Sequence, residues 1–128
     1  MRHFKIELKP FSYELRVYFP RKLKDITKLY PRAEIAPDID GCFFRVPYKD
    51  GDDVHDVIAI QNEGWNNESW INKVGIMVHE SIHCVYHLLK DHGVNDEEMT
   101  AYYVQYIVSE ICRNYDFEEN EIKRSGNK

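Results

Sequence analysis

The hydrophobic pattern of this chain changes period near its middle, and this change limits the folds that the chain can adopt. In residues 4–8 and 13–19, apolar and polar side chains alternate, which is the period of half-buried strands, and residues 42–48 and 54–61 are apolar, β-branched or aromatic stretches. From about residue 68, the apolar side chains recur every three to four residues, which is the period of amphipathic helices. Strands followed by helices predict an α+β fold, with a small sheet packed on helices.

The first half of the chain contains four predicted strands. They cover residues 4–8, 13–19, 42–48 and 54–61. Pro10 and Ser12 occupy the turn between the first two strands, and Asp50-Gly51 is a hairpin signal between the last two. Between these pairs, residues 21–30 are expected to form a short helix that stops at Pro31.

Two longer helices are predicted in the second half. The apolar residues of the first, over 68–91, are Val74, Met77, Val78, Ile82, Val85 and Leu89. Asn66 or Asn67 can cap its start and Gly93 can end it. Asn95 is the expected N-cap of the second helix, which runs to about Tyr115. The predicted order is β-β-α-β-β-α-α, with a mostly antiparallel sheet packed on two to three helices.

The length of the chain favours one domain. A chain of 128 residues and 15.3 kDa can bury one core but is short for two. We therefore expect a single domain over residues 1–117 and a charged, flexible tail over 118–128. No apolar run is long enough to span a bilayer, and the first residues lack the apolar core of a signal peptide. Three cysteines without a CxxC pair fit reduced thiols, so we expect a cytoplasmic protein.

The charge of the chain argues against nucleic acid as its partner. The net charge is −5, although residues 1–32 hold nine Lys or Arg and only three Asp or Glu. A protein that binds nucleic acid through an overall basic surface would carry the opposite net charge. The basic N-terminal region is explained equally well as a solvated strand and helix face.

The residues that indicate chemistry lie in the first long helix, where His79-Glu80-Ser81-Ile82-His83 forms an H-E-x-x-H motif. Two histidines four residues apart share one helix face, so both imidazoles can reach one metal ion. Glu80 points about 100° away from His79 around the helix and can contact a water on that ion. This pattern predicts a Zn²⁺ site in which Glu80 is the general base of a hydrolase.

Catalytic zinc usually has a third protein ligand, for which the next helix offers two acidic residues. Glu98 lies 15 residues after His83 and is our preferred third ligand, with Glu97 as its substitute. Glu98 also has a structural alternative, because Asn95-x-x-Glu98 resembles a capping box in which Glu98 binds the N-cap amide.

The motif His79-Glu80-x-x-His83 followed by Glu98-x-x-Ala101-Tyr102 resembles the gluzincin branch of the zincin metallopeptidases. It is most similar to the minimal forms encoded by phages and mobile elements, which would place the protein in the host cytoplasm. The resemblance covers about residues 55–110 and implies a small zincin-like fold. It implies His79, His83 and Glu98 as zinc ligands and Glu80 as the base. It also implies an edge strand that pairs with an extended substrate, for which the matching residues are Val57, Ile58, Ala59, Ile60 and Gln61.

The expected function is therefore a zinc metallopeptidase with a narrow range of protein or peptide substrates. The chain has no clear equivalent of the second lobe of a full-length peptidase, so an alternative stays open. In that alternative, the protein is a catalytically silent binding or inhibitor module that zinc stabilises.

Overall fold

A computed structural model gives the fold and describes residues 1–51, 53–62 and 69–115. The candidate helix caps Asn66 and Asn67 lie outside the described residues, and so does the predicted tail over 118–128. The described part of the chain contains no helix long and apolar enough to cross a membrane.

The order of elements follows the predicted order with one difference. The elements are β1 (Arg2–Glu7), β2 (Glu14–Phe19), η1 (Leu23–Lys28), β3 (Gly41–Pro47), β4 (Val54–Ile60), α1 (Ser69–Asp91) and α2 (Glu97–Tyr115). The helix expected over 21–30 is a shorter 3₁₀ helix, η1. Leu23 and Ile26 are three residues apart, so the three-residue turn of a 3₁₀ helix brings both onto the sheet, where both are buried.

The four strands form one mixed sheet in the order β1-β2-β4-β3. The pairs β1–β2 and β3–β4 are antiparallel hairpins, and a parallel pairing of β2 with β4 joins them. The expectation of a mostly antiparallel sheet is therefore confirmed, with a parallel pair at its centre. Strands β1 and β3 are the two edges, and β4 is an interior strand.

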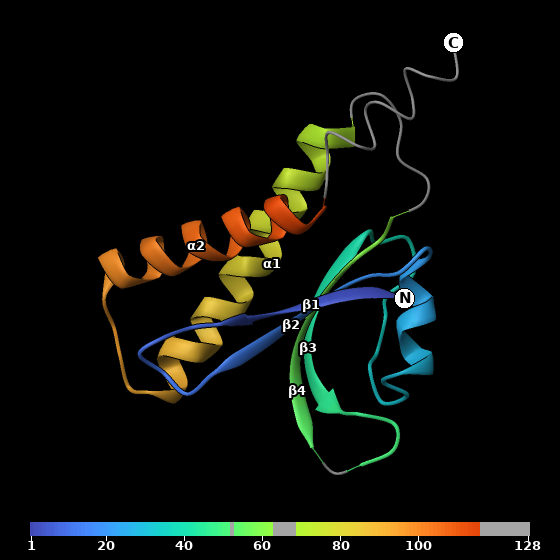
Figure 1. The fold of residues 1–128 in the computed structure, drawn as a ribbon, viewed down its shortest axis with the longest axis horizontal. Helices are drawn as coiled ribbons and strands as arrows, with labels where there is room; N and C mark the ends of the chain where they lie inside the picture. The colour runs from blue at the N-terminus through green and yellow to red at the C-terminus, as the bar shows by residue number, and fades with distance from the viewer. Residues whose placement is uncertain (52, 63–68, 116–128) are drawn as a thin grey trace.

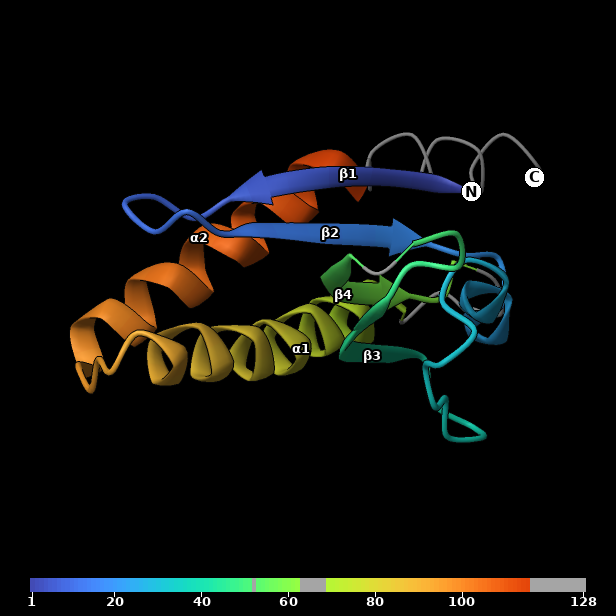
Figure 2. The ribbon, with the colours of Figure 1, turned by 90° about the horizontal axis from the view of Figure 1, so that it is seen from below.

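The sheet has a covered layer on each face (Figures 1 and 2). Helices α1 and α2 pack on one face and share a core with β1, β2 and β4. The short η1 helix and the segment after it cover the other face, where Tyr30 is fully buried. Strand β4 contributes to both cores, and Val57, Ile58, Ala59 and Ile60 are each 0% exposed. Burial on both faces explains why residues 57–60 of β4 form an unbroken apolar run.

Helix α1 ends as the sequence predicts. Gly93 adopts a positive φ of 66°, which glycine tolerates because it has no Cβ. The amide of Val94 donates to the carbonyl of Leu89 at 2.8 Å, and that of Gly93 donates to Lys90 at 3.1 Å. This is the Schellman arrangement, which satisfies the last carbonyls of a helix and turns the chain toward α2.

The start of α2 differs from the prediction by one residue. The carboxylate of Asp96, not the side chain of Asn95, accepts a hydrogen bond from the amide of Met99 at 2.8 Å. Asp96 is therefore the N-cap, and the capping box proposed for Asn95 and Glu98 is wrong. Asp96 caps because α2 begins at Glu97, which leaves Asn95 in the connecting loop.

The apolar stripe predicted for α1 is also partly wrong. Ile82 is 48% exposed, whereas Met77, Cys84 and Leu88 are fully buried. Met77, Val85 and Leu89 of the predicted stripe are buried as expected, so Ile82 is the exposed exception.

Candidate metal centre

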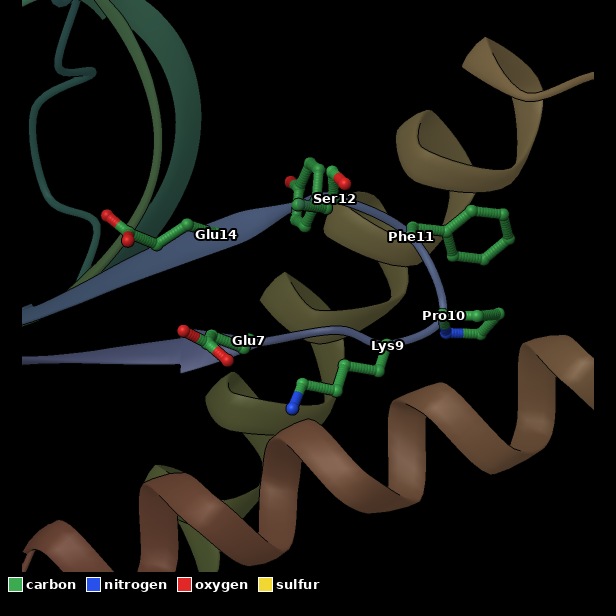
Figure 3. A pocket seen from close by; sticks show the side chains of 7 residues that line it. Glu7, Lys9, Pro10, Phe11, Ser12 and Glu14 are labelled. Carbon is green, nitrogen blue, oxygen red and sulfur yellow. The ribbon is translucent and has the colours of Figure 1, made fainter.

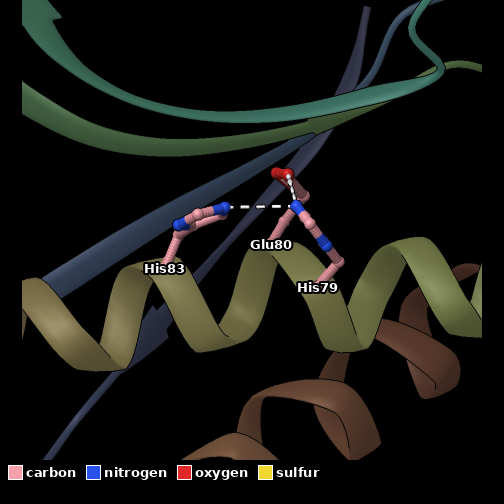
Figure 4. A group of neighbouring side chains, drawn as sticks. All are labelled: His79, Glu80 and His83. Carbon is pink, nitrogen blue, oxygen red and sulfur yellow. Dashed lines mark hydrogen bonds and ion pairs between the residues drawn. The ribbon is translucent and has the colours of Figure 1, made fainter.

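The two histidines and the glutamate of the H-E-x-x-H motif lie together on α1, as the sequence predicts. His79, Glu80 and His83 point from α1 toward β3 and β4, on the side of the helix opposite to α2 (Figure 4). The two histidines are exposed, and Glu80 is only 5% exposed. A ligand atom from each of the three residues lies within 4.8 Å of the other two, so the group could hold a metal ion.

The distance between the two imidazoles suits a shared ion. The Nε2 atoms of His79 and His83 are 3.2 Å apart. Two nitrogens bound to one tetrahedral zinc at its usual bond length lie about 3.3 Å apart. In a protein without metal, the same separation fits a hydrogen bond between one protonated and one unprotonated nitrogen.

Glu80 has an unsatisfied carboxylate oxygen. Its Oε1 is 3.8 Å from His79 Nε2, while its buried Oε2 has no hydrogen-bond partner among the described residues. Burial raises the pKa of the Glu80 carboxyl above its ordinary value, and the charges of His79 and His83 oppose that shift. A buried acceptor without a partner is costly unless a water, a metal or a substrate group satisfies it.

A glycine on β3 lies beside this carboxylate. A Cβ on Gly41 would lie 2.3 Å from Cγ2 of Ile76 and 3.7 Å from Cγ of Glu80. The absent side chain therefore allows the first residue of β3 to approach α1 at the motif. The two imidazole nitrogens and the partnerless oxygen of Glu80 together fit a metal ion and its water.

The acidic residues predicted as third ligands do not join the group. Glu97 and Glu98 are exposed in the first turn of α2, and the described residues bring only Glu80 to the two histidines. His83 is eight residues before the end of α1, which is about 12 Å along its axis. Because α2 starts beyond that end of α1, its first turn is remote from the motif (Figures 1 and 2).

The prediction that the substrate strand lies at an edge of the sheet is also wrong. Residues Val57–Ile60 belong to β4, which pairs with β2 on one side and β3 on the other. Gln61 follows the strand, and its side chain accepts a hydrogen bond from the amide of Leu23 at 2.9 Å. The strand next to α1 with an open edge, in the described part of the chain, is β3. A hydrophobic run does not reveal this, because strand order depends on pairing between distant segments.

An ionic cluster at the far end of β3 was missed by the sequence analysis. Arg45 donates from Nε to Oδ1 of Asp56 at 2.6 Å and from a terminal nitrogen to Oδ2 at 2.8 Å. Its guanidinium also lies 2.8 Å from the carboxylate of Asp91 on α1. The Tyr13 hydroxyl donates a further hydrogen bond to Asp56, which is 8% exposed. The cluster holds the end of α1 against the sheet. The one sign of this cluster in the sequence was the charged Asp56 within the mostly apolar strand β4.

A separate hollow of about 640 Å³ lies at the turn between β1 and β2 (Figure 3). Its lining residues are Glu7, Lys9, Pro10, Phe11, Ser12, Tyr13 and Glu14. None of them belongs to the group of His79, Glu80 and His83. The turn that forms this hollow is anchored to α2 by the Tyr103 hydroxyl, which donates to the carbonyl of Lys9 at 2.7 Å.

Comparison of the chain with protein-family models, curated proteins and solved structures gives no match.

Proposed function

We propose that this protein is a zinc-dependent hydrolase, and specifically a small metallopeptidase. The observation that carries the proposal is the 3.2 Å separation of the His79 and His83 Nε2 atoms beside the buried carboxylate of Glu80. His79 and His83 would hold the ion, and bound zinc supplies Lewis-acid activation of a water and of the substrate carbonyl. The proposal includes a zincin-like fold, because the motif resembles that of the zincin metallopeptidases.

Glu80 is assigned the role of general base. Its Oε1 lies 3.8 Å from His79 Nε2, which is longer than the separation of about 3.4 Å expected for two ligands of one tetrahedral zinc. This distance supports a place beside the ion. The carboxylate accepts a proton as the water adds to the peptide carbonyl, and it returns that proton to the amine as the C–N bond breaks.

The substrate is assigned to the open edge of β3. An extended peptide can add a strand to a free sheet edge through backbone hydrogen bonds. Gly41 begins this strand next to Glu80, so a peptide paired with β3 would run past the motif. Pro47 ends the strand and limits the length of edge that can pair.

The test uses untagged protein loaded with one equivalent of zinc and assayed on a mixed peptide library. We expect stoichiometric zinc and cleavage in the wild type. His79→Ala should lose both zinc and cleavage, whereas Glu80→Gln should keep zinc and lose cleavage by more than about 100-fold.

Glu34→Gln is the matched control for the carboxylate, because Glu34 is exposed and outside the group. It should behave as the wild type does. A wild type that binds no zinc under these conditions would overturn the proposal.

A second candidate function is a binding module in which zinc adds only folding free energy. The observation that favours it is the lack of a third ligand from Glu97 or Glu98. In this case the wild type and Glu80→Gln would both bind zinc and peptide, and neither would cleave. Zinc-dependent cleavage in the wild type would dismiss the second candidate.

A further inference from the structure

The side of β3 that faces α1 makes three different kinds of contact, which follow one another along the strand from the candidate metal centre. Gly41 approaches Glu80, Phe43 stacks on His87, and Arg45 binds Asp91. These three residues alternate along β3, so they share one face of the strand.

The strand and the helix keep step from Phe43 to Arg45, whose partners His87 and Asp91 are four residues apart. Gly41 contacts Glu80, which is seven residues before His87, so the helix advances further than the strand over the first step. Two residues of a strand advance about 6.6 Å, and one turn of a helix advances about 6 Å over four residues. His87 is one turn after His83, and Asp91 is one turn after His87. A peptide paired with β3 would therefore meet the motif first, the aromatic pair second and the charged cluster last.

The aromatic pair is partly open to solvent. The rings of Phe43 and His87 lie 5.5 Å apart at an angle of 24°, and both residues are half-buried. Tyr86, which is 59% exposed, contacts the edge of His87 at a centroid distance of 5.5 Å. The exposed sides of these rings offer an apolar surface one turn away from His83.

We propose that Phe43 and His87 form a side-chain subsite that selects peptides with an aromatic residue two positions from the cleaved bond. The register of this subsite rests on the proposed peptidase function, in which the reacting carbonyl lies at His79 and His83. A residue directly opposite Phe43 on an added strand has its Cβ about 5 Å from that of Phe43. An aromatic side chain at that position contacts both rings of the pair.

The size of the preference follows from cross-strand pairing. Aromatic cross-strand pairs are favoured over alanine to an extent that corresponds to roughly a two- to fivefold change in an equilibrium or rate constant. The charged cluster at Arg45 and Asp91 lies beyond this subsite, where a third same-face side chain of the peptide would lie.

The experiment uses zinc-loaded protein and ten-residue peptides of threonine and alanine in which a single phenylalanine is moved along the chain. Mass spectrometry gives the cleaved bond, and kcat/KM is measured for each peptide. We expect kcat/KM to rise roughly two- to fivefold when the phenylalanine lies two residues from the cleaved bond on one side. Phe43→Leu and His87→Ala should each remove this preference.

Phe44→Leu is the matched control. Phe44 is the next residue of β3, but it packs on the opposite face of the sheet against Tyr30. It should keep the preference of the wild type. If Phe43→Leu does not fold, as judged by circular dichroism, His87→Ala decides the outcome.

The outcomes separate this inference from the proposed function. Cleavage without a positional preference overturns the subsite and leaves the peptidase intact. If nothing is cleaved, fluorescence anisotropy of the same peptides on zinc-loaded Glu80→Gln decides. Tighter binding at one phenylalanine position, lost in Phe43→Leu/Glu80→Gln, supports the subsite while the peptidase fails. Absence of both binding and cleavage overturns both.

Discussion

His79 and His83 lie one helical turn apart on α1, with their Nε2 atoms 3.2 Å apart on the side that faces β3 and β4. Among the described residues, only Glu80 brings a further ligand atom to this pair. Four predictions follow from this geometry and its surroundings.

Zinc affinity should depend on the motif and not on the first turn of α2. Glu97→Gln and Glu98→Gln should leave the dissociation constant for zinc within about twofold, since neither carboxylate reaches the group. His83→Ala should weaken binding by more than about 100-fold, because outer-shell partners alone account for 10- to 100-fold. Competition with a chromogenic chelator measures both effects. A large loss in Glu98→Gln would show that α2 supplies a ligand after all.

The ion pair of Arg45 and Asp56 should contribute measurably to stability. Arg45→Met removes two hydrogen bonds from a carboxylate that is 8% exposed, and we expect a loss of about 3 kcal/mol in the free energy of unfolding. Urea denaturation measures this loss. The additional change Asp56→Asn should restore part of it, because no unpaired charge then stays buried.

Lys28→Met is the control for loss of a cation. The Lys28 ammonium lies 3.8 Å from Asp25 and its side chain is 78% exposed. Its removal should cost less than about 0.5 kcal/mol. Equal effects of Arg45→Met and Lys28→Met would contradict the importance of the buried carboxylate.

The close approach of β3 to α1 requires a glycine at position 41. Gly41→Ala places a methyl group 2.3 Å from Cγ2 of Ile76, so we expect destabilisation of about 1–3 kcal/mol. The double variant Gly41→Ala/Ile76→Ala should recover part of this loss relative to Ile76→Ala alone, because the clashing atom is removed. Thermal or urea unfolding of the four proteins completes the cycle. Additive effects of Gly41→Ala and Ile76→Ala on the free energy of unfolding would contradict the close contact between the two positions.

Stability should fall at alkaline pH. Burial raises the pKa of the Cys42 thiol to about 12, with a further contribution from Glu80, and burial also raises that of the Tyr30 hydroxyl. Above about pH 9 the unfolded chain loses the thiol proton that the folded protein keeps, so rising pH favours unfolding. Below pH 8 both states are protonated and the effect is absent.

We expect a loss of about 1.5–2 kcal/mol for Cys42 between pH 8 and pH 10. Urea unfolding at pH 7.5, 9 and 10 measures it, and Cys42→Ala should show a shallower fall than the wild type. If Cys42 is ionised in the folded protein, the stability of Cys42→Ala should fall with rising pH as steeply as that of the wild type.

Local patterns were sufficient for most of the elements. Alternation over β1 and β2, the Asp50-Gly51 turn between β3 and β4, and the Gly93 stop of α1 all depend on neighbours within a few residues. The spacing of His79 and His83 is of the same kind, since a helix alone brings residues four apart together. These features were predicted because backbone geometry and short-range sterics decide them.

Pairing between distant segments decided the rest. The order β1-β2-β4-β3 places β4 in the interior and leaves β3 as the edge beside α1, which no single strand pattern reveals. The turn from α1 into α2 lies at the far end of α1, which keeps Glu98 away from the motif (Figures 1 and 2).

The amino-acid sequence by itself determined a sheet followed by two helices, with His79, Glu80 and His83 on one helix. Only the tertiary structure decided that Gly41 of β3 lies against Glu80 and that Phe43 stacks on His87. The physical reason is the distance along the chain over which each kind of interaction acts. Helical spacing and turn chemistry act over a few bonds, whereas strand order and helix packing follow from burying both faces of one sheet at once.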